Sequence, residues 1–220
     1  MTASEPAKPF DAAAFAAERQ RMVRWQVESR GVKDQRALAA MRKAPRHLFS
    51  PSSRVAEAHD DNPLPIGAGQ TISQPYIVAL MTELAELAPD SRVLEVGTGS
   101  GYQTYMLASL AREVFTMEIH AELQDTARGL LERLGLTNIV FRLASGWGGW
   151  PEAAPFDAIV VTAAPAIIPS ALKEQLADGG RLVIPFGAEF HQTLAVVRRQ
   201  GVSFVEKEII PVRFVPMGEG

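Results

Sequence analysis

Three glycines at alternate positions, Gly97, Gly99 and Gly101, follow a short apolar run at residues 93–96 and precede a helical pattern that begins near Tyr102. The order strand, glycine turn, helix is typical of the nucleotide-binding corner of an open α/β sheet. Glycine suits such a corner because the chain turns sharply there and because a ligand can press against bare backbone. The stretch therefore predicts a binding site for a nucleotide-like cofactor.

Two acidic residues narrow the choice of ligand. Glu95 stands two positions before Gly97, so the pattern is Glu-x-Gly-x-Gly-x-Gly rather than the G-x-G-x-x-G fingerprint of dinucleotide-binding folds. This tighter form resembles the first motif of S-adenosylmethionine (AdoMet) methyltransferases, whose loop need not hold phosphates, and Glu95 would lie near the cationic end of AdoMet, directly or through water. Glu118 follows Gly97 by about 20 positions, where an acid would hold the ribose hydroxyls. The alternative is a glycine turn without a ligand, which the presence of both acids disfavours.

The elements that must position these residues alternate along the chain. Apolar periodicity predicts helices at 11–29, 34–42, 102–111, 121–134 and 169–177, and strands at 93–96, 113–117, 139–143, 157–161, 181–185, 194–198 and 202–212. The last two strands have no helix between them, and Gly201 supplies their turn. We therefore expect an α/β fold of the Rossmann-like, doubly wound class, with a mostly parallel seven-stranded sheet, an antiparallel C-terminal hairpin and an N-terminal helical elaboration.

We expect one methyltransferase domain over residues 1–220, because no linker or internal repeat is visible. Residues 1–10 read as a disordered lead-in, 11–90 as a helical, substrate-facing part and 91–220 as the AdoMet-binding core. Within the first part, residues 46–69 contain three prolines and two glycines and read as a loop that covers the substrate. Ser73 reads as the N-cap of the next helix, with Pro75 in its first turn, and the free N–H groups of that helix end could receive a carboxylate.

Composition excludes several classes of protein. Of 220 residues, 47% are hydrophobic and the net charge is −3 with a pI near 5.9, which argues against nucleic acid as the main partner. Cysteine is absent, and the four histidines lack metal-ligand spacing, so we expect no metal. No apolar run reaches the ~18 residues of a membrane span, and no signal-peptide pattern opens the chain. A soluble, cytoplasmic, monomeric protein is the expectation.

The region around Ser73 resembles one family, the protein-L-isoaspartate O-methyltransferases, and the resemblance extends over about residues 20–218. The matching stretches are 30–32 (RGV), Met41, 45–47 (PRH), Phe49, 63–76 (PLPIGAGQTISQPY), 93–103 (VLEVGTGSGYQ), 154–157 (APFD), 161–165 (VTAAP), 179–185 (GGRLVIP) and 212–217 (VRFVPM). The proline–glycine–serine stretch at 63–76 is far more specific than the glycine loop.

The resemblance implies a function in protein repair. Family enzymes use AdoMet to methylate the α-carboxylate of isoaspartyl residues in damaged proteins and peptides, and the ester then closes to a succinimide. It also implies a catalytic role for Ser73, with Thr71 and Ile72 in the same cofactor-facing segment. The implied AdoMet contacts are Thr71, Ile72, Glu95, Gly97, Thr98, Gly99, Ser100, Gly101, Glu118, Ser145 and Gly146. Because a carboxylate attacks a methyl group on a sulfonium, the enzyme need only align the reactants. Ser73 would aim the carboxylate by a hydrogen bond.

The sequence departs from the family pattern at the predicted adenine site. Ala144-Ser145-Gly146 replaces the usual Gly-Asp-Gly, and a neutral hydroxyl forms a weaker hydrogen bond than a carboxylate does. Trp147 and Trp150 could wall the adenine pocket or could belong to a packed loop, and Arg213 is a candidate ligand for the substrate carboxylate. Two alternatives remain: a divergent or non-catalytic AdoMet-binding relative, and a nicotinamide-dependent oxidoreductase, which would need the longer glycine spacing.

Overall fold

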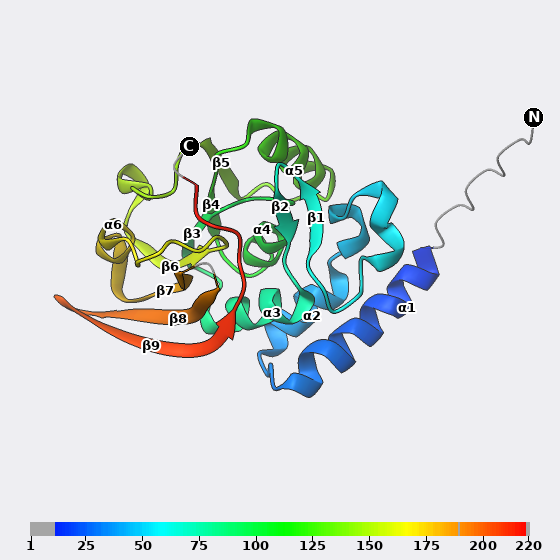
Figure 1. Ribbon diagram of the computed structural model, residues 1–220, viewed down its shortest axis with the longest axis horizontal. Coiled ribbons are helices and arrows are strands. Elements are labelled where there is room, and N and C mark those ends of the chain that lie inside the picture. Colours follow the sequence, from blue (N-terminus) through cyan, green and yellow to red (C-terminus); the bar gives the residue numbers. More distant parts are fainter. Residues whose placement is uncertain (1–11, 189, 219–220) are drawn as a thin grey trace, which may run out of the picture.

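A seven-stranded sheet forms the centre of the computed structural model, which describes residues 12–188 and 190–218 (Figure 1). The strand order is β5-β4-β3-β6-β7-β8-β9; the first five strands are parallel, and β8 and β9 are antiparallel to their neighbours. The strands are β3 (Arg92–Val96), β4 (Glu113–Glu118), β5 (Ile139–Leu143), β6 (Phe156–Val161), β7 (Leu176–Ala188), β8 (His191–Gln200) and β9 (Ser203–Val212). The predicted fold class is confirmed; the expected disordered lead-in at 1–10 lies outside the described residues.

The order of the strands reverses at β3, which lies between β4 on one side and β6 on the other. In register, Val96 pairs with Met117 of β4 and with Val161 of β6, so the carboxyl ends of these three strands meet at one edge of the sheet. Open α/β sheets bind ligands in the crevice beyond such a switch point.

Apolar side chains cover both faces of the sheet. One face packs against the N-terminal helices and against α3 (Pro75–Leu84), α4 (Tyr102–Ala108) and α5 (Ala121–Arg133). The other face packs against α6 (Ser170–Glu174) and the loop that carries Trp147 and Trp150. Burial on both faces explains why the central strands read as continuous apolar runs in the sequence.

The N-terminal helices follow their sequence signals. α1 (Ala12–Met22) continues without a break through a π-helical turn (Val23–Val27) and a 3₁₀ turn (Glu28–Arg30), and ends at Gly31 with φ of +98°. α2 (Gln35–Lys43) begins after Asp34, whose carboxylate accepts hydrogen bonds from the N–H groups of its first turn, as predicted.

The stretch at 46–69 is more ordered than the loop that its prolines and glycines predict. It contains two 3₁₀ helices, η3 (Arg46–Phe49) and η4 (Ser52–Glu57), and the strand β1 (Leu64–Gly67), which pairs with β2 (Gln70–Ile72). A turn with positive φ at Ala68 and Gly69 joins these two strands. Farther on, α6 is shorter than the predicted helix at 169–177, because β7 already begins at Leu176.

The N-cap assignment of Ser73 is wrong. α3 begins at Pro75, and Gln74, with extended ψ of 139°, occupies the N-cap position without a capping bond from its side chain. The reason is that β2 runs as far as Ile72, so the backbone stays extended until the fixed φ of Pro75 starts the helix. Ser73 therefore lies in the short connection between β2 and α3, and its hydroxyl is not used to cap the helix.

None of the helices in the described part of the chain has the length and apolar character needed to cross a bilayer. Among the same residues, no group of three or more histidine, aspartate or glutamate side chains is placed to hold a metal ion.

Candidate active site

A cavity of about 340 Å³ opens at the carboxyl edge of β3, β4 and β6. Its wall combines the glycine loop after β3, the end of β2, the residues that follow β4 and β5, and the C-terminal segment. Eight predicted site residues and the predicted catalytic serine line it: Thr71, Ile72, Ser73, Gly97, Thr98, Gly99, Ser100, Glu118 and Gly146. The remaining predicted residues, Glu95, Gly101 and Ser145, are not part of the lining.

The first and third glycines of the loop have different uses. Gly97 has φ of +99°, and a Cβ at this position would collide with the hydroxyl of Thr162, so the loop lies directly against the end of β6. Gly101 has φ of +85°, and its missing Cβ makes room for Ala127 and Leu131 of α5, each 3.1 Å from the place a Cβ would occupy. Gly97 therefore shapes the cavity, whereas Gly101 permits close packing of α4 against α5.

Glu118 lies where the sequence predicts a ligand for ribose hydroxyls. Its Oε2 accepts a hydrogen bond from the N–H of Gly99 at 2.9 Å, and its Oε1 accepts from the N–H groups of Ile119 and His120 at 2.8 and 3.0 Å. A carboxylate has about four acceptor positions, so three N–H donors leave one for a ligand hydroxyl. The side chain is buried and its orientation is fixed by backbone groups.

Glu95 lies behind the glycine loop, away from the cavity. Its Oε2 accepts hydrogen bonds from the hydroxyls of Thr104 and Thr116, both at 2.6 Å, and desolvation by complete burial raises the pKa of its carboxyl group to about 8. Side chains alternate along β3, so Val96 reaches the cavity while Glu95 points beneath α4. Glu95 is therefore not placed to contact the cationic end of AdoMet directly, as the sequence had suggested. Instead, Thr116 links Glu95 to the hydroxyl of Thr98, 2.7 Å away, which lines the cavity.

The two tryptophans belong to a packed loop. The indole Nε1 of Trp147 donates a hydrogen bond to the carbonyl of Gly218 at 3.0 Å, and the ring of Trp150 packs edge-on against Phe115 at a centroid distance of 5.4 Å. Neither residue lines the cavity, whereas Ala144 and Gly146 on either side of Ser145 do. Of the two possibilities that the sequence left open, the structure supports packing.

The C-terminal segment, residues 213–218, forms a wall of the cavity; it overlaps the family-matching stretch 212–217, but its residues are not among the predicted cofactor contacts. It leaves β9 and crosses the sheet toward the side of β5 (Figure 1, red). Ala164 holds it through two backbone hydrogen bonds, donating to the carbonyl of Val215 at 2.8 Å and accepting from the N–H of Met217 at 3.0 Å. Val215 and the three residues after it line the cavity.

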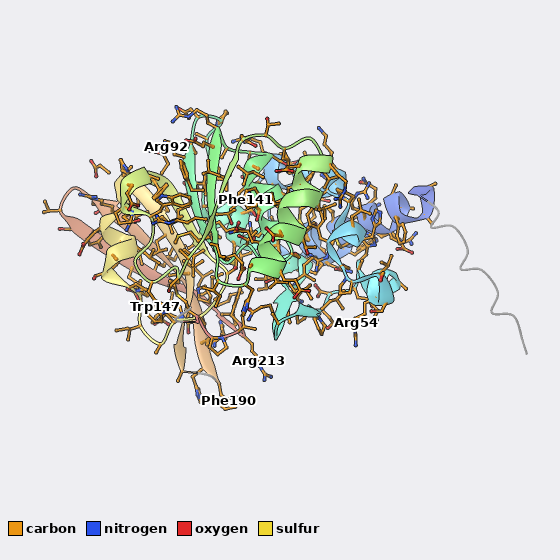
Figure 2. All side chains as sticks on the ribbon, turned by 90° about the horizontal axis from the view of Figure 1, so that it is seen from above. Arg54, Arg92, Phe141, Trp147, Phe190 and Arg213 are labelled. Atoms are coloured by element: carbon orange, nitrogen blue, oxygen red, sulfur yellow. The ribbon has the colours of Figure 1, made fainter. Side chains whose placement is uncertain are left out.

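A second cavity of about 450 Å³ adjoins the first. Its lining includes two cationic side chains, Arg30 and Arg213, and the ring of Tyr76. Figure 2 shows Arg213 and Trp147 toward one end of the strands, and Arg92, the first residue of β3, toward the other end. The two cavities share four residues: Thr71, Ser73, Thr162 and Val215.

Ser73 and Thr162 place hydroxyl-bearing residues at this shared wall. The hydroxyl of Thr162 donates to the carbonyl of Gly97 at 2.7 Å and is also 3.1 Å from the carbonyl of Val96, so it is engaged by the glycine loop. The hydroxyl of Ser73 makes no hydrogen bond to another described residue. Ser73 is thus available to a ligand through its hydroxyl, as is Thr71 at the same wall, whose hydroxyl also bonds to no other described residue. Thr162 was not predicted as a site residue, although it falls in a stretch, 161–165, that matches the family.

Comparisons with known proteins show which family the chain is similar to. A family model described as protein-L-isoaspartate(D-aspartate) O-methyltransferase matches residues 17–220. A protein-L-isoaspartate O-methyltransferase of Synechococcus sp. is 50% identical over 97% of this chain and 90% of its own length, and a protein-L-isoaspartate O-methyltransferase 2 of Shewanella sediminis is 53% identical over 94% and 85%. Among solved structures, a protein-L-isoaspartate O-methyltransferase superposes with a TM-score of 0.81 at 27% identity, over 91% of this chain and 66% of the other.

Proposed function

The chain belongs to the protein-L-isoaspartate(D-aspartate) O-methyltransferase family, and on that premise we propose which of its residues bind the two reactants and align them. The protein methylates L-isoaspartyl residues of proteins with AdoMet as the methyl donor. In an isoaspartyl linkage the backbone runs through the side-chain carboxyl group, so the carboxylate left free to accept the methyl group is the α-carboxylate.

The first cavity fits AdoMet in shape and in the chemistry of its walls. Glu118 offers an acceptor for a hydroxyl, the bare backbone at Gly97 and Gly99 admits close approach, and Val96, Met117 and Met217 supply apolar surface for a flat ring. The residues that hold the cofactor are, in this proposal, Thr71, Ile72, Gly97, Thr98, Gly99, Ser100, Glu118 and Gly146. Glu95 and Gly101 support them from outside the lining, and Ser145 stands between two residues that line it.

The second cavity fits the isoaspartyl segment of a protein substrate. Arg213 is exposed, and Arg30 is held by Asp61 in an ion pair of 2.9 Å, so the lining presents two guanidinium groups near the place where a carboxylate must enter. The single observation that carries the assignment is the shared wall: Ser73 lines both cavities and has a hydroxyl that is not engaged by the rest of the described chain. Thr71 has the same two properties, and the family resemblance around residues 63–76 selects Ser73 between them.

AdoMet, when bound, supplies a methyl group activated by a sulfonium, so the protein need not provide a nucleophile. The task of Ser73 is to donate a hydrogen bond to the substrate carboxylate and to fix the direction of its attack. Thr162 keeps the glycine loop against β6, and Arg213 draws the anionic substrate into the second cavity. Alignment of this kind contributes much of the rate in reactions that need no acid or base.

We take the chain as one domain, because a single buried cluster joins the N-terminal helices to one face of the sheet. We take it as a monomer in the cytoplasm, since its substrates are other proteins and the site is complete within one chain.

Methyl transfer from labelled AdoMet to a short isoaspartyl peptide tests the assignment, with the corresponding aspartyl peptide as the blank. The Ser73→Ala variant should lower kcat/KM for the peptide by about 10- to 100-fold, in the range for loss of one aligning contact. Its dissociation constant for AdoMet should stay within about threefold, because the hydroxyl serves the substrate. Ser109→Ala is the matched control: this serine donates only to the carbonyl of Tyr105 in its own helix. Unchanged transfer by Ser73→Ala would remove Ser73 from the mechanism, and equal transfer to both peptides would overturn the substrate assignment.

A further inference from the structure

Arg46 is a fully buried arginine close to the active site. Its side chain has no exposed surface, and among the described residues no acidic group forms an ion pair with it. Its Nε donates to the carbonyl of Ala58 at 2.8 Å and its Nη2 donates to the carbonyl of Ser73 at 2.7 Å. The guanidinium carbon lies 4.6 Å from the centre of the ring of Tyr102, which lines the cofactor cavity.

A buried guanidinium without a counter-ion is a costly way to stabilise a fold. Removing such a charge from water is unfavourable even after hydrogen bonding, and the burial lowers the pKa of Arg46 from its usual value. Replacement of buried charges by apolar groups of similar size is often neutral or stabilising. The presence of a cation at this place is therefore better explained by the neighbouring active site than by stability.

We propose that Arg46 is a positioning residue for Ser73: its guanidinium clamps the carbonyls of Ala58 and Ser73 together and so fixes the serine at the wall between the two cavities. Ser73 lies in the short connection between β2 and α3, where neither strand nor helix hydrogen bonds hold it. A planar guanidinium reaches two acceptors at fixed angles, which a lysine ammonium does not. This inference rests on the role proposed above for Ser73.

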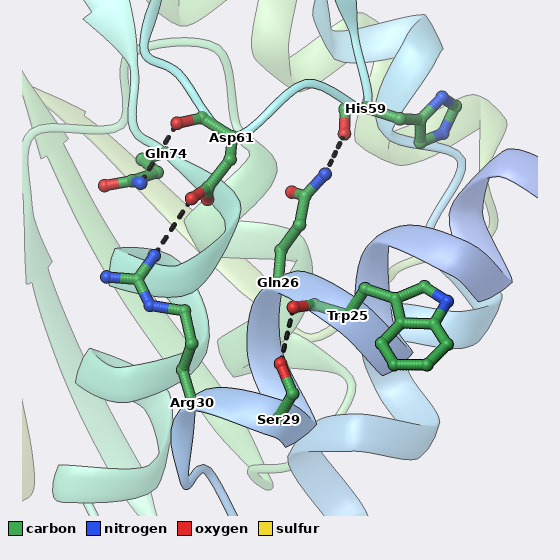
Figure 3. Close-up of polar contacts among 7 residues, drawn as sticks. All are labelled: Trp25, Gln26, Ser29, Arg30, His59, Asp61 and Gln74. Carbon is green, nitrogen blue, oxygen red and sulfur yellow. Dashed lines mark hydrogen bonds and ion pairs between the residues drawn. The ribbon is translucent and has the colours of Figure 1, made fainter.

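The segment at 58–61 that Arg46 uses as its anchor is itself held from three sides (Figure 3). Gln26 of the π-helical turn donates to the carbonyl of His59 at 2.8 Å, and Gln74 donates to the carbonyl of Asp61 at 3.0 Å. Arg30 donates to the carboxylate of Asp61 at 2.9 Å. The guanidinium of Arg46 thus ties Ser73 to a segment that is held by two residues of the N-terminal helices and by Gln74, the residue after Ser73.

The test compares Arg46→Lys and Arg46→Met with Arg36→Met. Arg36 is a suitable control because it also donates to two backbone carbonyls, but these belong to Leu87 and Leu110, which line neither cavity, whereas Ser73 lines both. Three quantities are measured for each: the melting temperature, the dissociation constant for AdoMet, and kcat and KM for the isoaspartyl peptide. Arg46→Met should lower kcat by about 10- to 100-fold, as expected for a reacting group displaced by about 1 Å, while AdoMet affinity stays within about threefold. Arg46→Lys should recover only part of kcat.

Chemical rescue separates positioning from folding. In Arg46→Ala, millimolar guanidinium chloride should raise kcat several-fold at constant melting temperature, whereas methylammonium chloride should not. A parallel fall of melting temperature, AdoMet affinity and kcat, without rescue, would show that Arg46 only supports the fold. Should Arg36→Met lose as much kcat as Arg46→Met, the effect would not be specific to the active site.

A double-mutant cycle with Ser73→Ala distinguishes this inference from the one on which it rests. If Arg46 acts through Ser73, Arg46→Met should change the residual activity of Ser73→Ala by less than about twofold, so that the two effects are not additive. Full additivity would overturn the positioning role while leaving Ser73 in place. An active Ser73→Ala variant would instead overturn the function proposed for Ser73.

Discussion

The carboxylate of Glu118 and the backbone N–H of Gly99 form a hydrogen bond of 2.9 Å, which joins the acid after β4 to the glycine loop after β3. The bond makes two separate sequence motifs into one rigid wall of the cofactor cavity. Any change at Glu118 therefore acts on the ligand and on the loop together.

Glu118→Gln should weaken AdoMet binding by about tenfold or more. The amide has one acceptor oxygen where the carboxylate has two, so either a backbone N–H or the ligand hydroxyl loses its partner, and the surviving bonds lose their charge assistance. Calorimetric titration with AdoMet measures the effect. Glu122→Gln, at an exposed position of α5, is the control and should bind normally. Normal binding by Glu118→Gln would place the ribose elsewhere.

Gly97→Ala should destabilise the protein by about 1–3 kcal/mol, because an alanine at φ of +99° is strained and its Cβ collides with Thr162. Denaturant unfolding of the ligand-free protein gives the difference. Thr162→Ala removes the collision but keeps the strain, and it has its own cost because the hydroxyl bonds the glycine loop. In a Thr162→Ala background, Gly97→Ala should therefore cost less than it does in the native chain. Gly148→Ala, which would meet no atom within 4 Å, should have little effect. If Gly97→Ala costs as much in the Thr162→Ala background as in the native chain, the collision does not contribute.

Trp147→Phe should speed the release of AdoMet several-fold while leaving the free energy of unfolding nearly unchanged. The variant keeps the apolar ring but loses the hydrogen bond to the carbonyl of Gly218, and with it one of the contacts that hold the C-terminal wall. Stopped-flow displacement of bound AdoMet gives the rate. Trp25→Phe, at a side chain that is 63% exposed, is the matched control. Equal release rates in all three proteins would show that the wall is held without Trp147.

Glu95→Gln should remove a pH dependence of stability. Burial raises the pKa of this carboxyl group to about 8 in the folded state, from an ordinary value of 4.5. Between these two values the folded state binds the proton that the unfolded state has released, so the free energy of unfolding falls as the pH rises through this window and levels off above it. Native protein should thus lose on the order of a few kcal/mol more than Glu95→Gln between pH 5 and pH 9. Parallel pH profiles would show that Glu95 is ionised in the folded protein.

The sequence predicts well those parts of the site whose local structure follows from the residues of a single short segment. The buried strands read as apolar runs, and the turn at residues 97–101 needs glycine whatever surrounds it. Glu118 could be placed because it ends a strand whose carboxyl end must lie at the ligand edge.

What could not be predicted depends on contacts between distant segments. The side of β3 to which Glu95 points follows from which face α4 covers, and the sequence signal alone suits either side. Thr162 and residues 215–218 reach the cavity only because β6 and β9 lie in the same sheet as β3. The N-cap assignment of Ser73 failed because the hairpin of β1 and β2 keeps the backbone extended up to Pro75. The prolines and glycines of this hairpin are typical of loops, so the sequence pattern does not indicate the two strands.

The irregular pairing of β8 with β9 fixes the length of the chain between the sheet and the active site. Leu194 pairs with Ile210 but Ala195 pairs with Glu208, so Ile209 is an extra residue in β9. Six positions after Ile210 the chain reaches Pro216, which bridges to Ala164 beside the cofactor cavity. An insertion or deletion at the hairpin turn near Gly201 leaves this interval intact, whereas one between the bulge and Pro216 shifts every wall residue by a position. Natural variation in chain length should therefore accumulate at the turn and be absent from residues 210–216.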